Sequence, residues 1–155
     1  MTASQRIAEL GLSLPTAAAP IGSYQPAVVV GDLVYTSGQL PTVEGNLVAT
    51  GKLGAEVSLE DGAAAARTAG LNAIAAVANV AGGVDNISKI IKVTAFVSGT
   101  ADFAAQPKVA NGASDLFAEI FGDAGVHARS AVGVSSLPLN SPVEVEIIAQ
   151  VAVRS

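Results

Sequence analysis

The sequence predicts an α+β fold, in which a mixed β-sheet carries two main helices on one face. Two observations lead to this class: strand-like, β-branched runs alternate with helical runs, and their order is a hairpin, a helix, a strand, a helix and two strands. The chain has 155 residues, 50% of them hydrophobic, which is enough to bury one core. We therefore treat residues 1–155 as a single domain, with residues 1–11 as an N-terminal helical extension.

The first element is a short helix followed by a connector. Thr2 or Ser4 can cap a helix that runs through Leu10, and Gly11 is a suitable stop. Residues 12–22 contain two prolines around three alanines, so we expect an extended connector there.

A hairpin is predicted next. Ala27–Val30 and Leu33–Thr36 are apolar, β-branched runs, and the Gly31-Asp32 pair between them has the composition of a tight turn. Residues 37–54 are punctuated by glycines and a proline, and we expect them to form a loop.

Two helices have clear start signals. Ser58 can cap the first, Glu60 and Asp61 suit the positive end of its dipole, and Gly82-Gly83 ends it. The second is expected to begin between residues 104 and 108 and to continue through residue 121, with a proline near its start. The spacing of apolar positions predicts inward-facing residues in both helices: Leu71, Ile74, Ala78 and Ala81 in the first, and Val109, Leu116, Phe117 and Ile120 in the second.

Three further strands are predicted, over Ile87–Val97, Arg129–Val134 and Val143–Val153. Beyond Glu146, neither face of the last strand is polar enough for free solvent, and two helices can cover only one face of a sheet. We therefore expect the other face to be buried against further copies of the chain, in a homo-oligomer.

Composition and charge exclude several classes of partner and chemistry. The net charge is -5, and the 8 basic residues form no cluster, so we expect no nucleic acid partner. The chain has no cysteine and one histidine, which excludes thiolate chemistry and disfavours a zinc site. The polar residues near the N-terminus do not fit a signal peptide, and no stretch is apolar enough to span a membrane, so a cytoplasmic location is expected.

Arg129 is the most informative polar residue. Its neighbours on the same face of the predicted strand, Ala131 and Gly133, are small and leave room for a ligand. A planar guanidinium suits a carboxylate held by two hydrogen bonds. The alternative is a surface or subunit-bridging salt bridge.

Glu144 and Glu146 share one face of the last strand, because side chains repeat every second residue. A strand-borne carboxylate can orient a water molecule and accept its proton, particularly if partial burial raises its pKa. The residues alone do not assign this role to one glutamate over the other, and a solvated or ion-paired edge is the alternative. His127 is interpreted as structural, because metal-free acid–base catalysis of the nuclease kind needs a second imidazole or its equivalent.

Taken together, these residues resemble the RidA/YjgF family of enamine/imine deaminases, also known as the L-PSP endoribonuclease family. The resemblance covers the chain from Pro20 onward and rests on motifs in several elements: Ile21-Gly22-Ser23-Tyr24, residues 36–41, residues 92–97, Ala128-Arg129-Ser130-Ala131-Val132, Leu137-Pro138 and residues 143–147.

The resemblance implies a chorismate-mutase-like fold, a homotrimer, and a cofactor-free, metal-independent site in the clefts between adjacent subunits. By position, it implies that Arg129 binds the carboxylate and that Glu144 positions water. It also implies a group of substrate-binding positions: Tyr24, Gly38, Asn111, Ser130 and Ala131. Ser23 and Gly133 depart from the family pattern, which affects the shape of the Tyr24 loop and of the cleft.

The function that the resemblance implies is hydrolytic deamination of 2-imino acids, formed from enamine intermediates, to 2-keto acids and ammonia. The enzyme class is a 2-iminobutanoate/2-iminopropanoate deaminase-like hydrolase. A non-catalytic protein that binds or senses small carboxylates is the first alternative, and an endoribonuclease is the second, disfavoured by the acidic charge and the single histidine.

Overall fold

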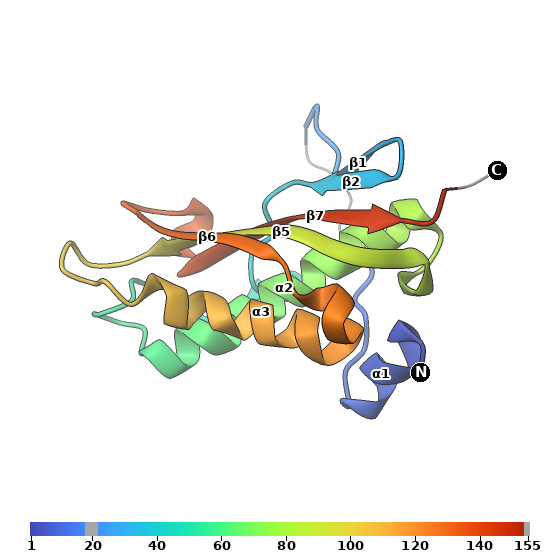
Figure 1. Ribbon diagram of the computed structural model, residues 1–155. Coiled ribbons are helices and arrows are strands. Elements are labelled where there is room, and N and C mark those ends of the chain that lie inside the picture. Colours follow the sequence, from blue (N-terminus) through green and yellow to red (C-terminus); the bar gives the residue numbers. More distant parts are fainter. Residues whose placement is uncertain (18–21, 154–155) are drawn as a thin grey trace.

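The computed structural model describes residues 1–17 and 22–153, and shows a sheet with its two long helices on one side (Figure 1). The central sheet has five strands, in the spatial order β1 (Ala27–Val30), β2 (Leu33–Thr36), β7 (Val143–Val151), β5 (Ile87–Ser98) and β6 (Ala128–Val134). Neighbouring strands are antiparallel except β5 and β6, which are parallel. The predicted α+β class, with a mixed sheet and two main helices on one face, is therefore confirmed.

The helix α2 (Leu59–Ala81) begins and ends where the sequence predicts. The Ser58 hydroxyl accepts a hydrogen bond from the Asp61 backbone N–H at 3.1 Å, and Gly82 takes the left-handed conformation at the C-terminal end, with φ 83°. The helix α3 (Gln106–Phe121) starts within the predicted range and has a proline in its first turn.

The helix faces that pack on the sheet are also largely those predicted from spacing. All four inward positions predicted for α3 are buried, as are Ile74, Ala78 and Ala81 of α2. Leu71 is only partly buried and lies at the margin of the core. The sheet meets these helices through β-branched and small side chains, such as Val93 and Val145, which are fully buried. A core of small residues brings the layers close together.

The N-terminal helix α1 (Ala3–Glu9) packs on the domain. Thr2 caps it in a capping box with Gln5. The backbone N–H and the hydroxyl of Ser4 donate to the Asp85 carboxylate at 2.8 and 2.7 Å, and Ile7 is buried. These contacts fasten the extension to the main domain, on the side of the helices (Figure 1).

Three local expectations need correction. The predicted loop over residues 37–54 contains a small hairpin, β3 (Thr42–Val43) paired with β4 (Asn46–Leu47). The last strand ends at Val151 rather than Val153, because the chain leaves the sheet and becomes exposed. Ala128 joins the start of β6. Of the predicted connector and first motif, residues 18–21, including Pro20 and Ile21, lie outside the described residues.

Within the described part of the chain, no helix combines the length and hydropathy needed to cross a membrane.

The helices α2 and α3 pack in close contact at Gly112. A Cβ atom added there would overlap the Ala63 carbonyl oxygen and lie 2.7 Å from the carbonyl carbon. Both are backbone atoms of α2, so neither can turn away. The absence of a side chain at residue 112 therefore sets the spacing of the two helices and, with it, the height of α3 beneath the sheet.

This contact predicts that Gly112→Ala destabilises the protein. An alanine inside a helix ordinarily gains about 0.5–1 kcal/mol over glycine. We expect a net loss of about 1–3 kcal/mol in the free energy of unfolding, because the helices must separate. Urea denaturation measures the effect, with Asn79→Ala on the exposed face of α2 as a control that should be neutral or slightly stabilising. A Gly112→Ala protein as stable as the unsubstituted protein would contradict this account.

Candidate functional site

Arg129 lies on the edge strand β6 and points toward the helices. It pairs in register with Val93, whose side chain is buried beneath the sheet on the helix side. Arg129 Nη1 donates two hydrogen bonds to α3, to Asn111 Oδ1 at 2.8 Å and to Ser114 Oγ at 3.1 Å. The guanidinium therefore bridges the sheet edge and the helix.

One edge of this guanidinium has no hydrogen-bond partner among the described residues. An arginine has five N–H donors, and the bonds to Asn111 and Ser114 use both donors on Nη1. Within residues 1–17 and 22–153, no acceptor bonds Nε or Nη2 of Arg129. The two ion pairs among these residues, Arg6–Glu9 and Arg67–Glu119, do not involve Arg129. The Nε and Nη2 protons form a planar fork that matches the two oxygens of a carboxylate.

Glu144 lies on β7, on the opposite face of the sheet. Its neighbours along the strand, Val143 and Val145, are fully buried under the helices, so alternation directs Glu144 away from them. Burial raises the pKa of the Glu144 carboxyl above its ordinary value, and the like charge of Glu146 raises that pKa further. A carboxylate with a raised pKa is a stronger proton acceptor near neutral pH.

Gly38 leaves the space that the Glu144 side chain occupies. A Cβ atom at residue 38 would overlap Glu144 Oε1 and lie 2.7 Å from Cδ. The chain reaches this position through a bridge in which Gln39 and Val145 exchange backbone hydrogen bonds at 2.8 and 3.0 Å. Gly38 and Glu144 therefore form one contiguous surface.

Tyr24 is 54% exposed in the segment that precedes β1. This segment is fastened to Ser37, whose hydroxyl donates to the Gln25 carbonyl at 2.6 Å and whose backbone N–H donates to the Pro26 carbonyl at 2.8 Å. Because Ser37 adjoins Gly38, the Tyr24 segment lies at the end of the sheet where Gly38 meets Glu144.

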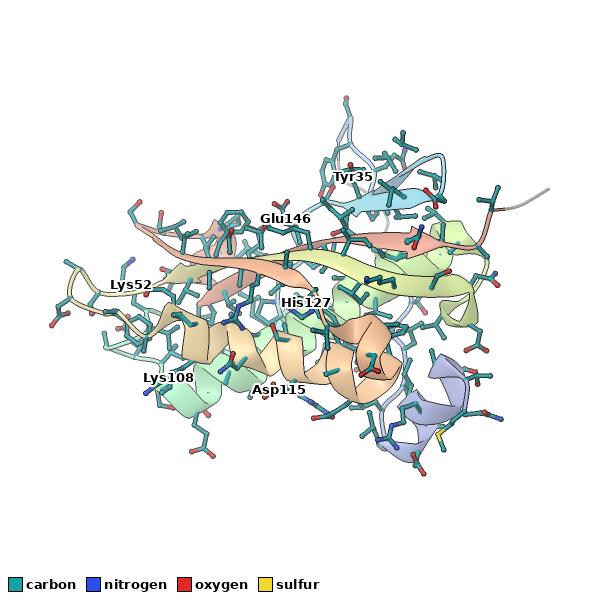
Figure 2. All side chains as sticks on the ribbon, in the orientation of Figure 1. Tyr35, Lys52, Lys108, Asp115, His127 and Glu146 are labelled. Carbon is teal, nitrogen blue, oxygen red and sulfur yellow. The ribbon has the colours of Figure 1, made fainter. Side chains whose placement is uncertain are left out.

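The remaining predicted positions divide between the two faces. Ala131 shares the face of Arg129, while Ser130 is exposed on the opposite face, in register with Thr94. Figure 2 shows Glu146 on that opposite face, away from the helices, whereas His127 lies between the sheet and α3.

Arg129 and Glu144 do not meet within one chain. Glu144 is in register with Phe96, which is in register with Val132, three residues along β6 from Arg129. Two strand spacings and three residue steps separate the Cα atoms by roughly 14 Å, and the side chains leave opposite faces. A site that uses both groups must therefore draw them from different copies of the chain.

Two residues linked to Arg129 by hydrogen bonds, one directly and one through the other, were not assigned to the site from the sequence. Ser114 bonds Arg129 directly, and its hydroxyl lies 2.8 Å from His127 Nε2. His127 Nδ1 lies 2.6 Å from the Gly125 carbonyl oxygen. The sequence spacing could have pointed to Ser114, because Ser114 follows Asn111 by three positions and therefore lies on the same face of the helix.

Among the described residues, no cluster of three or more His, Cys, Asp or Glu side chains is placed to bind a metal ion.

The sheet and its helices define a chorismate-mutase-like α+β domain. Residues 4–151 match the model of the family described as YjgF/chorismate mutase-like, putative endoribonuclease. The chain belongs to this YjgF family, as the motifs around Arg129 and Glu144 predicted.

Similar proteins carry several different names. Protein TCP17 of Trypanosoma cruzi is 39% identical over 155 residues, which is 97% of each chain. A 2-iminobutanoate/2-iminopropanoate deaminase of Dermatophagoides farinae is 36% identical and covers 88% of this chain and 92% of its own. The crystal structure of a putative endoribonuclease from Shewanella oneidensis MR-1 has a TM-score of 0.93 at 38% identity, covering 97% of this chain and all of that one.

The burial of Glu144 and the charge of Glu146 predict the direction in which the pKa of Glu144 is shifted. We expect its pKa to lie above the ordinary glutamate value, and Glu146→Gln to lower that pKa by removing a like charge. The pKa should stay above the ordinary value in this variant, since burial is the larger cause. Carbon-13 NMR of labelled glutamate carboxyls, assigned with Glu144→Gln, measures both, and Glu60→Gln on the exposed start of α2 should leave the pKa unchanged. A Glu144 carboxyl that titrates at the ordinary value would contradict the burial described above.

Proposed function

We propose that the protein hydrolyses 2-imino acids to 2-keto acids and ammonia, in sites shared between two copies of the chain. The observation that carries this proposal is the Nε and Nη2 edge of Arg129, which no acceptor in the described part of the chain bonds. Every 2-imino acid has a carboxylate next to the reacting carbon, which this edge can bind. The deaminase name of the Dermatophagoides farinae relative, at 36% identity over most of both chains, supports the same chemistry.

The proposed reaction needs one anchor and one proton carrier. The carboxylate binds the Arg129 fork, which brings the C=N carbon to a fixed place beside Glu144 of a neighbouring copy. Glu144 accepts a proton as water adds to that carbon and returns it to the imine nitrogen, which gives a carbinolamine. Glu144 then passes the carbinolamine hydroxyl proton to the same nitrogen as the C–N bond breaks, so that the C=O bond forms and ammonia leaves. Positioning supplies most of the acceleration, because such imines also hydrolyse unaided. No metal ion is needed for these steps.

Assembly is part of the proposal. The sheet face away from the helices exposes apolar side chains, with Val28 49%, Tyr35 42% and Val132 44% exposed. Burying this face against further copies would remove apolar surface from water and would bring Glu144 of one chain toward the edge strand of another. A homotrimer, as implied by the family resemblance, is the assembly that we propose.

Substitution of Arg129 tests the anchor. Arg129→Ala removes two charge-assisted hydrogen bonds, together worth about 3 kcal/mol, so we expect kcat/KM to fall roughly 100-fold or more. Arg129→Lys keeps the charge without the fork and should lose less. Ammonia release from imines generated in situ measures the activity, and circular dichroism with sedimentation checks fold and assembly. Unchanged turnover in correctly folded Arg129→Ala would refute the assignment.

The same assay separates the alternatives. A protein that binds or senses carboxylates would bind pyruvate in an Arg129-dependent manner and show no imine turnover. An endoribonuclease would cleave RNA at a rate that survives substitution of both Arg129 and Glu144.

Complementation between inactive variants tests whether the site is shared. In a cyclic assembly, the arginine of one copy would face the glutamate of the next, so Arg129→Ala and Glu144→Gln chains would together rebuild intact sites. Co-expressed in equal amounts, they should recover about one quarter of the original activity, because random assembly leaves both groups intact at one interface in four. Each variant expressed alone is the control. No recovery in mixed assemblies, confirmed by mass spectrometry, would show that the two groups do not serve one site.

A further inference from the structure

The single histidine has its tautomer set by its neighbours. His127 Nδ1 lies 2.6 Å from the Gly125 carbonyl oxygen, and a carbonyl oxygen can only accept a hydrogen bond. Nδ1 must therefore carry a proton. In the neutral ring, Nε2 is then left with its lone pair and can only accept.

That arrangement determines the direction of the next two hydrogen bonds. Ser114 Oγ lies 2.8 Å from His127 Nε2, so the serine hydroxyl donates to the ring. The oxygen keeps its lone pairs and accepts from Arg129 Nη1 at 3.1 Å. Arginine has no acceptor, so this last bond also runs in one direction only. The path from Arg129 through Ser114 and His127 ends on a backbone carbonyl.

The end of this path is held by tight packing. A Cβ atom at Gly125 would overlap the Phe117 carbonyl oxygen, so the backbone that accepts from His127 lies directly against α3. The His127 ring packs edge-on against Phe117, with ring centroids 5.7 Å apart and planes at 78°. The imidazole therefore has little freedom to turn.

From these contacts we infer that Ser114 and His127 are positioning residues, which hold the Arg129 guanidinium so that its Nε and Nη2 edge faces a carboxylate ligand. Asn111 Oδ1 and Ser114 Oγ each accept one hydrogen bond from Nη1, which fixes the plane of the guanidinium. An arginine that is already oriented loses less side-chain entropy when its ligand binds. The inference rests on the proposed function only in taking Arg129 as the carboxylate anchor.

Paired variants test the effect on binding, with pyruvate as the probe and calorimetry as the measurement. Ser114→Ala removes the acceptor for Nη1 and should weaken binding roughly tenfold, or about 1.4 kcal/mol. Ser114→Thr keeps the hydroxyl and should remain within about twofold of the original affinity. The same assay tests His127. His127→Asn keeps a donor near Gly125 but loses the Nε2 acceptor, so it should weaken binding about threefold. His127→Gln retains an acceptor and should bind pyruvate nearly as well as the original protein does.

Two spectroscopic readouts separate positioning from general stability. Because the chain has one histidine, its nitrogen-15 NMR signals need no assignment. Recorded with the ring neutral, they should show a proton on Nδ1 and none on Nε2. The Nη1 and Nη2 signals of Arg129, assigned with Arg129→Lys, should be distinct in the original protein and should merge by faster rotation in Ser114→Ala. The melting temperature should differ little between Ser114→Ala and Ser114→Thr.

The outcomes are distinguishable. A proton on Nε2 of the neutral ring would overturn the inference and leave the deaminase proposal intact. Ser114→Ala that binds pyruvate as tightly as Ser114→Thr does would have the same consequence. If the original protein binds pyruvate without turning over imines, the deaminase proposal fails while the binding series still decides the inference. If it binds no pyruvate, the proposed function fails, and the Arg129 nitrogen signals decide whether Ser114 orients the guanidinium.

Discussion

The close packing of α3 on α2 beneath the sheet is the constraint on which the candidate site depends. Gly112 lies against the backbone of Ala63, so the two helices meet without an intervening side chain. One position before this contact is Asn111, and two after it is Ser114, the two residues that bond Arg129 on the edge strand. A change in helix spacing would move both acceptors relative to the strand. The packing of the two helices thus also determines where the Arg129 guanidinium is held.

The sheet divides the functional groups between its faces. The guanidinium of Arg129 lies on the helix side, whereas Glu144 projects from the opposite side next to Gly38. A small substrate that is held by its carboxylate and attacked at the adjacent carbon cannot reach both groups in one chain. The intersubunit site that we propose would remove this difficulty, and the same assembly would cover the apolar sheet face that is exposed within the chain.

The electrostatic character of the two groups suits different tasks. Both Nη1 donors of Arg129 are bonded, whereas no acceptor among residues 1–17 and 22–153 bonds its planar Nε and Nη2 edge, which favours a ligand with two coplanar oxygens. Burial and a neighbouring glutamate raise the pKa of Glu144, which keeps its proton exchangeable closer to neutral pH. Neither property requires a cofactor.

The sequence by itself determined the order of the main helices and strands and the ends of α2, because caps, glycine stops and apolar spacing act locally. Ser58 and Gly82 mark the ends of α2, and the Gly31-Asp32 turn separates β1 from β2. It also pointed to Arg129 and Glu144 through the motifs around them. Only the tertiary structure decided that these residues leave opposite faces of the sheet, that Ser114 bonds the Arg129 guanidinium, and that His127 bonds Ser114. Strand register and helix height arise from packing between segments far apart in the chain, so no local pattern encodes them.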